Sequence, residues 1–522
     1  MSKAKVYIAS AVAAMTGALF GYSVGFVGGI LVLPSFLRHF HLDALPDVDL
    51  ARAQSLVVSS WITGALFGVP MGIPICARYG RKMCLTFSAA LYVAGTALQV
   101  INAGSSLGLF EVGRLLNGSG VGAGTLVSPI YISEISPPAD RGMLMSGYQV
   151  MIQSSALLGF WGSYAANAAV PETSDLQWQI PVAVQLVPGA ILLFGTLYLK
   201  ETPPYLASTK NLDAVSESLA WLRGLPTTDP SVAREAKALY LRVLAGARRQ
   251  AIRHWNFLHE AFTEPIRTRL LVGVGLFIVQ NTSGMNALNY YVALIFMTAG
   301  FNTVSSSLFL TGIFGAVKLI SAAVFMFLCV RIYGNRFWLI AGMGTCAICM
   351  FILGFCAAES SPLSSIPQVH ITPNSILSVL SVYIFSLSFG VSIGPIAWNV
   401  CSEIFPGYIN EACCAVTTCT QWLFQIVVAA ITPILLASVG PWTFFIFGAS
   451  NLLGLLFCWA LVPETRGVAL GKEMSAVFGQ EIKDEDGGGS EEPEVEEVDD
   501  RTPLLGADRA TRRRRSSIAI VV

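Results

Sequence analysis

The sequence predicts an all-α membrane protein with twelve transmembrane helices in two homologous six-helix halves. Its composition is the first reason: of 522 residues, 54% are hydrophobic and 12% are charged, whereas a soluble domain carries about 25% charged residues. Because a membrane-spanning helix needs about 20 apolar residues, the chain has enough apolar sequence for about a dozen. This composition excludes a soluble enzyme of several domains, and a formal net charge of +0 gives no basic surplus for nucleic acid.

Twelve apolar stretches are the second reason. Each carries few or no charged residues and is long enough to cross the hydrocarbon core. They split six and six around the charged segment 200–267, where apolar residues at helical spacing predict short amphipathic helices. The stretches are 6–34, 55–76, 83–103, 107–135, 143–166, 178–199, 268–298, 306–329, 336–358, 374–400, 410–437 and 441–462.

An internal repeat is the third reason, because short motifs recur after corresponding stretches. Three such matches indicate two halves of the same topology, related by an axis along the membrane normal, with a ligand site at their interface near the midplane. The predicted organisation is a first half at 1–199, a linker at 200–267, a second half at 268–462 and a tail at 463–522. The matches are Ser133 to Pro137 with Ser402 to Pro406, Tyr79-Gly80-Arg81 with Tyr333-Gly334-Asn335, and Glu201-Thr202 with Glu464-Thr465.

The distribution of Lys and Arg predicts the orientation. Basic residues concentrate in the loops after the second, fourth, sixth and eighth stretches, so the positive-inside rule places both termini in the cytosol. The plasma membrane is the expected location. The tail combines glycine with acidic and basic runs, which predicts disorder. Its Leu504-Leu505 resembles a dileucine signal, which adds a sorting adaptor as a partner and a vacuolar or endosomal membrane as the alternative.

Several motifs follow one another in a specific order. They are Gly113-Arg114 with Gly118, Gly120 and Gly122; Pro129 to Glu134 (PIYISE) with Arg141-Gly142; Gln280 to Tyr291 (QNTSGMNALNYY); Gly394 to Trp398 (GPIAW); Glu403 to Pro406 (EIFP); Gln421-Trp422; and Pro463 to Gly467 (PETRG). With them the chain resembles the sugar porter family of the major facilitator superfamily over about residues 6–470, particularly its fungal members. The resemblance implies the major facilitator fold and transport by alternating access. We expect neither an enzyme nor a cofactor, since the histidines are scattered and no paired metal-ligand spacing occurs.

Amide side chains inside the spans are the candidates for substrate binding. An unpaired amide is costly in hydrocarbon, whereas amides and an aromatic face suit a polyhydroxylated ligand such as a hexose. Gln153 shares a helix face with Gln149. Hydrogen bonding between helices, without ligand contact, is the alternative interpretation. The resemblance implies that Gln149, Gln280, Asn281, Asn286, Trp398 and Gln421 contact the substrate and that Tyr290 and Tyr291 form the outer gate.

Ser23 bears on proton coupling. In proton-coupled members of the family this position carries an Asp that pairs with an Arg on the fourth span, here Arg114. Serine does not titrate at physiological pH, so we expect a facilitator that carries a hexose-like monosaccharide. The alternatives are a proton-coupled carrier of sugar, quinate or polyol that uses another acid, and a sensor that does not transport. Glu111, one helical turn from Arg114, is a candidate for that acid.

Lys318 lies near the middle of the eighth stretch, about 18 Å from either end. An ammonium inside the membrane needs a partner or a wet cavity. Packing or gating is one interpretation of this residue, and pairing with an anionic substrate such as quinate is the other.

Charged residues at the cytosolic ends form the last candidate site. The resemblance implies an ion-pair network that holds the outward-facing state closed on the cytosolic side. Several partners usual in the family are absent, for example the Arg that Asn410 replaces. We therefore expect a protein that rests more inward-open than its relatives or is partly degenerate as a transporter. The matching residues are Arg114, Glu134, Arg141, Glu201, Glu403, Glu464 and Arg466.

Overall fold

Every regular element of the described chain is a helix. The structure is a computed structural model, and all the described helices lie within the unit Met1–Gln480. Leu504-Leu505, the predicted sorting signal, lies outside the described residues. Those residues are 4–101, 106–137, 141–209, 211–251, 264–298, 300–301, 303–329, 332–359, 372–405 and 410–465.

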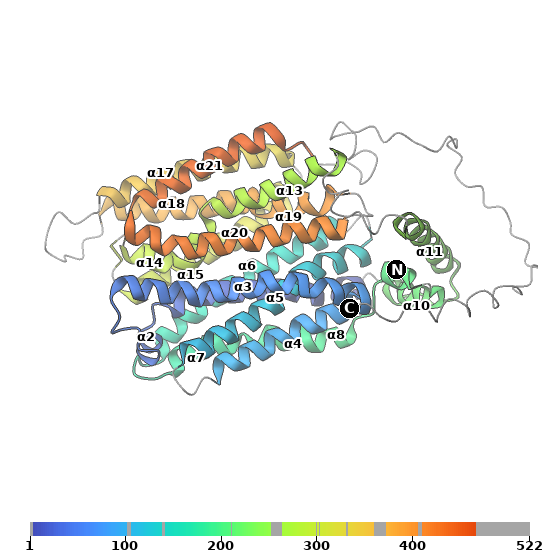
Figure 1. The fold of residues 1–522 in the computed structure, drawn as a ribbon, viewed down its shortest axis with the longest axis horizontal. Helices are drawn as coiled ribbons and strands as arrows, with labels where there is room; N and C mark the ends of the chain where they lie inside the picture. Colours follow the sequence, from blue (N-terminus) through green and yellow to red (C-terminus); the bar gives the residue numbers. More distant parts are fainter. Residues whose placement is uncertain are drawn as a thin grey trace, which may run out of the picture. The chain divides into compact units, whose positions relative to one another are not determined.

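The helices of the first half coincide with the first six predicted stretches (Figure 1). Its sixth stretch divides into two helices, and a short additional helix, α2, follows the first. The elements are α1 (Ala4–Ile30), α2 (Pro34–His39), α3 (Asp47–Tyr79), α4 (Arg81–Val100), α5 (Leu107–Ile135), α6 (Arg141–Ala169), α7 (Leu176–Val184) and α8 (Leu186–Tyr198).

The second half follows three linker helices, α9 (Pro203–Ser208), α10 (Leu212–Arg223) and α11 (Pro230–Ala251). Its first and fourth stretches are each broken into two helices. At the first break Gly284 has φ +97°, a conformation that side chains rarely adopt. The elements are α13 (Glu264–Thr282), α14 (Met285–Thr298), α15 (Val304–Val324) with a π-helical turn η1 (Phe325–Cys329), α17 (Asn335–Glu359), α18 (Pro373–Gly390), α19 (Ile393–Glu403), α20 (Asn410–Ser438) and α21 (Trp442–Leu461).

Ten spans in the described chain are long and apolar enough to cross a membrane. The two remaining stretches are α5 and α6, with 29 residues each. Helix α5 lies between α3 and α4 and carries glycines where their backbones approach it. A Cβ on Gly118 would lie 2.0 Å from the carbonyl oxygen of Trp61. Small residues thus replace large apolar ones where helices meet closely.

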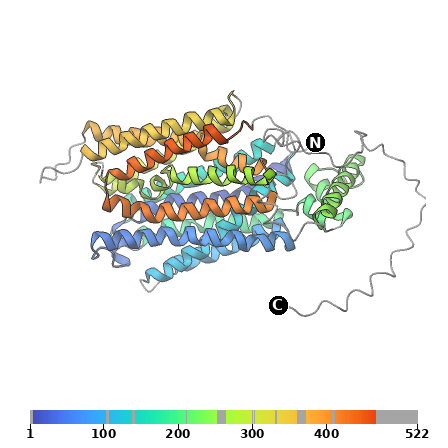
Figure 2. The ribbon, with the colours of Figure 1, turned by 45° about the horizontal axis from the view of Figure 1, so that its top comes forward.

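The two halves meet along α3 with α20, α6 with α15, and α1 with α14 (Figures 1 and 2). We call the end of the bundle that carries α2 the α2 end, and the end that adjoins α9 to α11 the linker end. Two apolar clusters join the halves. One, toward the α2 end, includes Ile30, Phe36, Tyr291 and Leu308, and the other includes Phe160 of the first half and Phe314 of the second. Between the halves, the Trp422 ring lies 5.2 Å from Phe20 and 5.7 Å from Trp61.

Apolar packing at the linker end is confined to each half. Among the described residues one cluster contains Val6, Cys76 and Leu199 of the first half and the linker residue Leu222. The other contains Ile266 and Val462 of the second half. The halves therefore pack against each other toward the α2 end, whereas at the linker end each half has its own apolar core.

Candidate functional site

A continuous chain of hydrogen bonds links five polar side chains of the second half. Asn286 on α14 donates from Nδ2 to Oδ1 of Asn281 (2.5 Å), and Asn281 donates to Oε1 of Gln421 (2.5 Å). Gln421 on α20 donates to Oε1 of Gln425 (3.2 Å), whose Nε2 donates to the hydroxyl of Tyr290 (2.6 Å). We call these five residues the amide chain. It connects three predicted substrate contacts to a predicted gate tyrosine.

The side chain of Gln280 forms hydrogen bonds with the backbone next to the break between α18 and α19. Its Nε2 donates to the carbonyls of Ile393 (3.1 Å) and Gly394 (2.8 Å), which belong to the first turn of α19. Its Oε1 is buried without a partner and can accept from a ligand hydroxyl. On the same helix pair the ring of Trp398 packs at 4.8 Å against Phe277 of α13.

The other two predicted contacts come from the first half. Gln149 and Gln153 are half-buried on one face of α6. The Oε1 atom of Gln153 is buried without a hydrogen-bond partner. Helix α6 contacts α15 of the second half, so this face lies at the boundary between the halves.

The two predicted gate tyrosines are almost fully buried, with 1% of each exposed. The hydroxyl of Tyr291 donates to the carbonyl of Ala429 on α20 (3.1 Å). The backbone of Tyr290 lies against Gly28 of α1, where a Cβ would be 2.6 Å from the Tyr290 carbonyl oxygen. Helices α1, α14 and α20 are thus closed around these tyrosines.

Ser23 belongs to a buried polar cluster rather than to an ion pair. Its hydroxyl lies 3.1 Å from the Tyr92 hydroxyl, 3.5 Å from Oδ1 of Asn117 and 3.4 Å from Oε1 of Gln185. Asn117 also accepts a 2.8 Å bond from Nε1 of Trp61. This cluster joins four elements of the first half without a charged member among those contacts.

Arg114 is fully buried and has no acidic partner in the described chain. Its Nε donates to the carbonyl of Val57 (3.3 Å), while Nη1 and Nη2 have no hydrogen-bond partner. Its guanidinium lies 5.6 Å from the rings of Phe26 and Trp61. The half-buried Glu111 does not pair with it, so the expected contact along the helix is absent.

The placement of Arg114 in the network of cytosolic ion pairs is wrong. Glu134 lies twenty residues further along α5, which corresponds to about 30 Å of helix. Arg114 lies toward the α2 end, whereas Glu134 lies at the linker end. Helix α5 continues without a break from Arg114 to Glu134, so the two side chains lie at different depths of the bundle.

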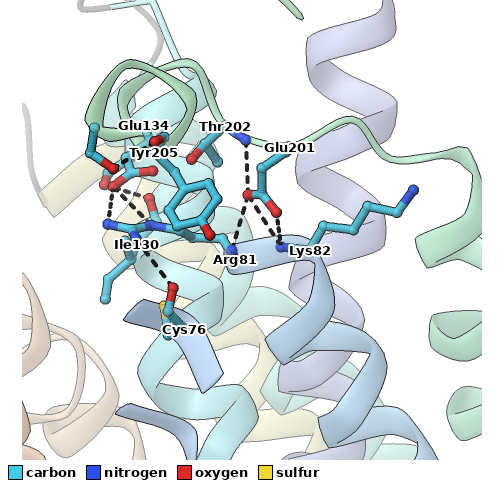
Figure 3. A network of polar contacts seen from close by, with 10 residues as sticks. Cys76, Arg81, Lys82, Ile130, Glu134, Glu201, Thr202 and Tyr205 are labelled. Carbon is cyan, nitrogen blue, oxygen red and sulfur yellow. Dashed lines mark hydrogen bonds and ion pairs between the residues drawn. The ribbon is translucent and has the colours of Figure 1, made fainter. Parts of the chain in front are cut away.

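At the linker end the described network centres on Arg81, which the sequence interpretation did not include (Figure 3). Its Nη2 forms a 3.0 Å ion pair with Oε1 of Glu134. Its guanidinium carbon lies 5.4 Å from the centre of the Tyr205 ring. The Glu201 carboxylate accepts from the backbone N–H groups of Arg81 (3.0 Å), Lys82 (3.1 Å) and Thr202 (3.0 Å). A carboxylate at the amino end of α4 satisfies N–H groups that the helix leaves free.

The second half repeats this cap. The Glu464 carboxylate accepts from the backbone N–H groups of Asn335 (2.9 Å) and Arg336 (3.2 Å), at the amino end of α17. The Tyr-Gly and Glu-Thr repeats therefore belong to one structural motif that occurs in both halves. The glutamate of Glu-Thr caps the amino end of the helix that follows Tyr-Gly. Asn335 replaces the ion-pairing Arg81 and donates to Thr465 instead (2.9 Å). The side chains of Arg141, Glu403 and Arg466 lie outside the described part of the network.

Burial and hydrogen bonding act in opposite directions on Glu201. Burial raises its pKa above the ordinary value, while the three backbone N–H groups and the charge of Arg81 lower it. The pKa of Glu201 is raised overall, because burial destabilises the charged carboxylate more than these contacts stabilise it.

Lys318 is buried between the halves. Its Nζ donates to Oδ1 of Asn289 on α14 (2.7 Å). The same ammonium lies 5.5 Å from the ring of Phe314 on α15 and 5.8 Å from that of Phe160 on α6. The partner Asn289 and the ring Phe160 were not identified as its neighbours from the sequence.

Simple spacing rules could have found two further site residues. Gln425 follows Gln421 by one helical turn, and Asn117 follows Arg114 by three residues, so each pair shares a helix face. Arg81 could have been found from the repeat, because it follows Tyr79-Gly80 as Asn335 follows Tyr333-Gly334.

A bundle of this kind, with two six-helix halves and polar amides at their interface, defines a membrane transporter of the major facilitator type. The model of the family described as "Sugar (and other) transporter" matches residues 9–478. The chain therefore belongs to this family, the sugar porters, whose members are transporters and not enzymes. The prediction of twelve transmembrane helices in this fold is confirmed.

Related proteins are named for a particular substrate. The quinate permease of Emericella nidulans is 33% identical over 476 residues, which cover 91% of this chain and 88% of that protein. A probable quinate permease of Aspergillus niger is 34% identical over 485 residues, with the same coverage of both chains.

Solved structures share the fold. The proton:xylose symporter XylE bound to 6-bromo-6-deoxy-D-glucose superposes with a TM-score of 0.76 at 24% identity, covering 92% of this chain and 100% of that one. The partially occluded inward open conformation of XylE from E. coli gives 0.73 at 24% identity, covering 90% and 100%.

Proposed function

We propose that this protein carries a small polyhydroxylated molecule across a membrane by alternating access, without obligatory proton coupling. The amide chain is the observation that carries the proposal. Its Asn286, Asn281 and Gln421 offer donors and acceptors of the kind that ligand hydroxyls need, and its other end bonds Tyr290. A ligand that takes over bonds of Gln421 changes the contacts that hold Tyr290 closed, which links substrate to gate.

The uncoupled mode rests on the surroundings of Ser23. The residue is buried among the neutral groups of Tyr92, Asn117 and Gln185, and none of them exchanges a proton with water at physiological pH. The partly exposed Glu111 makes no ion pair with Arg114 in the described chain. This cluster therefore holds no group that could couple a proton gradient to accumulation of the substrate.

The packing of the halves supports a proposal for the direction in which the carrier opens. Among the described residues, two apolar clusters contain residues of both halves, and neither of the two clusters at the linker end does. We assign the linker end to the cytosol on the distribution of Lys and Arg, with the plasma membrane as location. With this orientation, the packing supports our proposal of a carrier that rests closed to the outside.

Uptake measurements test this function. Cells that lack hexose carriers would express the full chain and receive labelled hexoses, pentoses, polyols and quinate at pH 5 and pH 7, with and without a protonophore. We expect at least one compound to enter without rising above its outside concentration, with or without the protonophore. Accumulation that collapses with the protonophore would contradict uncoupled transport. Binding without any uptake would favour the sensor instead.

A further inference from the structure

We infer that the substrate carries a carboxylate group and that Lys318 receives it. This inference rests on the proposed function and specifies its substrate class: a polyhydroxylated acid rather than a neutral sugar. It also assigns Lys318 as the residue that determines this specificity.

The surroundings of Lys318 leave its charge without a counter-ion. Only 5% of the residue is exposed, and its contacts in the described chain are the Asn289 amide and the rings of Phe314 and Phe160. Its own helix α15 carries no other charged residue, and α14 and α18, which pack against α15, carry none. On α6 the only charged residue is the terminal Arg141. Charged side chains buried in a membrane mark substrate pathways, because the membrane does not otherwise tolerate them.

The position of Lys318 is next to the predicted substrate contacts. Its partner Asn289 follows Asn286 by three residues and precedes Tyr290, so all three lie on one side of α14. That side carries both ends of the amide chain. The ammonium therefore lies beside the chain of groups assigned to ligand hydroxyls.

The approach of the first half brings a second set of amides to the same place. A Cβ on Gly315, one turn before Lys318, would lie 2.6 Å from the Phe160 ring, so α15 and α6 are in close contact here. Phe160 follows Gln153 by two helical turns on the same face of α6. Lys318 lies where the amide-bearing faces of the two halves converge.

The chemistry of the ammonium suits a carboxylate. Lysine has three N–H donors, and Asn289 takes one, while the ring faces of Phe160 and Phe314 attract the charge without occupying a donor. The ammonium is thus held in position with donors left for a ligand. Arg114, with unpartnered Nη1 and Nη2, adds a second buried positive charge, and together they favour an anion inside the bundle.

A matched pair of ligands separates this role from packing. Quinate and its primary amide share one ring and one set of hydroxyl groups and differ in charge. Purified full-length protein in proteoliposomes would be assayed for exchange of each compound, with ligand-induced stabilisation against heat as a second measure of binding. The variants are Lys318→Met and Lys318→Arg, with Arg52→Met as the control that removes a positive charge from a side chain that is 71% exposed.

We expect Lys318→Met to weaken quinate binding by about 10- to 100-fold, as loss of a charge-assisted bond does, and to change amide binding by less than about threefold. Lys318→Arg restores most of the quinate affinity, and Arg52→Met changes neither. If Lys318→Met does not fold, Asn289→Asp takes its place: a carboxylate at this position pairs with Lys318 and lowers quinate binding without lowering amide binding.

Two results overturn the inference. One is equal loss of both ligands, or loss of neither, in Lys318→Met or in Asn289→Asp. The other is wild-type protein that exchanges the neutral amide or a hexose but not quinate or any related acid; transport itself then stands and only the substrate class is wrong. If wild-type protein binds but exchanges no compound of either class, the proposed function fails before the substrate class is at issue.

Discussion

Replacing Gly80 by Ala tests whether the cap on α4 is a main support of the first half. Gly80 has φ +92° and ψ 173°, a region that is essentially confined to glycine. A Cβ at this position would lie 2.2 Å from Oε2 of Glu201, the carboxylate that accepts from three backbone N–H groups. The substitution therefore strains the backbone and displaces the cap together.

The two effects have separable magnitudes. A residue forced into this backbone region costs about 1–3 kcal/mol, and loss of a helix amino-terminal cap costs about 0.5–2 kcal/mol. We expect Gly80→Ala to destabilise the protein by about 1.5–5 kcal/mol in total. Gly334→Ala is the matched control, because its Cβ would lie 2.0 Å from Oε2 of Glu464 but its φ is outside the positive range. It should cost only the cap, about 0.5–2 kcal/mol.

Thermal unfolding in detergent, followed with a thiol-reactive dye, measures both variants. The thiols of Cys76 and Cys84 are buried near the first cap, so they react with the dye when this part of the protein opens. Gly80→Ala should lower the unfolding temperature clearly more than Gly334→Ala does. Equal shifts, or a smaller shift for Gly80→Ala, would refute the reasoning that backbone strain adds to loss of the cap.

Three other substitutions test the site. Ser23→Asp places an acid beside Asn117, which bonds Trp61, and the Trp61 ring also lies against the Arg114 guanidinium. We expect this variant to accumulate substrate and to lose the accumulation when a protonophore is added. Accumulation that the protonophore leaves intact contradicts this. Gln425→Leu leaves the Tyr290 hydroxyl without its 2.6 Å bond, at a cost of about 1–3 kcal/mol to the state closed at the α2 end. Spin-label distances across that end should shift toward an open population, and an unchanged distribution speaks against the gating role. Because burial raises the pKa of Glu201 above 4.5, its folded state holds the proton more tightly than the unfolded chain. Its contribution to stability relative to Glu201→Gln is therefore greatest below about pH 4.5 and declines as pH rises through the folded-state pKa. Unfolding temperatures at pH 4.5 and 7.5 check this, and a contribution that grows with pH is the contrary result.

The positions of the spans could be read from the sequence because hydropathy is a local property. Each of the twelve apolar stretches became a helix or a pair of helices. The break in the seventh span falls at the polar residues Thr282 and Ser283 and at Gly284, whereas the break in the tenth span, at Val391 and Ser392, was less evident from the sequence. The boundaries of halves, linker and tail stay predictions, as do the roles of the substrate contacts and gate.

The sequence by itself determined the class of membrane protein, the repeat and the polar residues of its interior. Only the tertiary structure decided which of these residues meet. It placed Glu201 on the helix after Gly80, moved Arg114 away from the charges at the linker end, and set Lys318 against Asn289 and two rings. The physical reason is that such contacts depend on how helices distant in sequence rotate and approach one another, and glycine contacts between whole helices fix that approach.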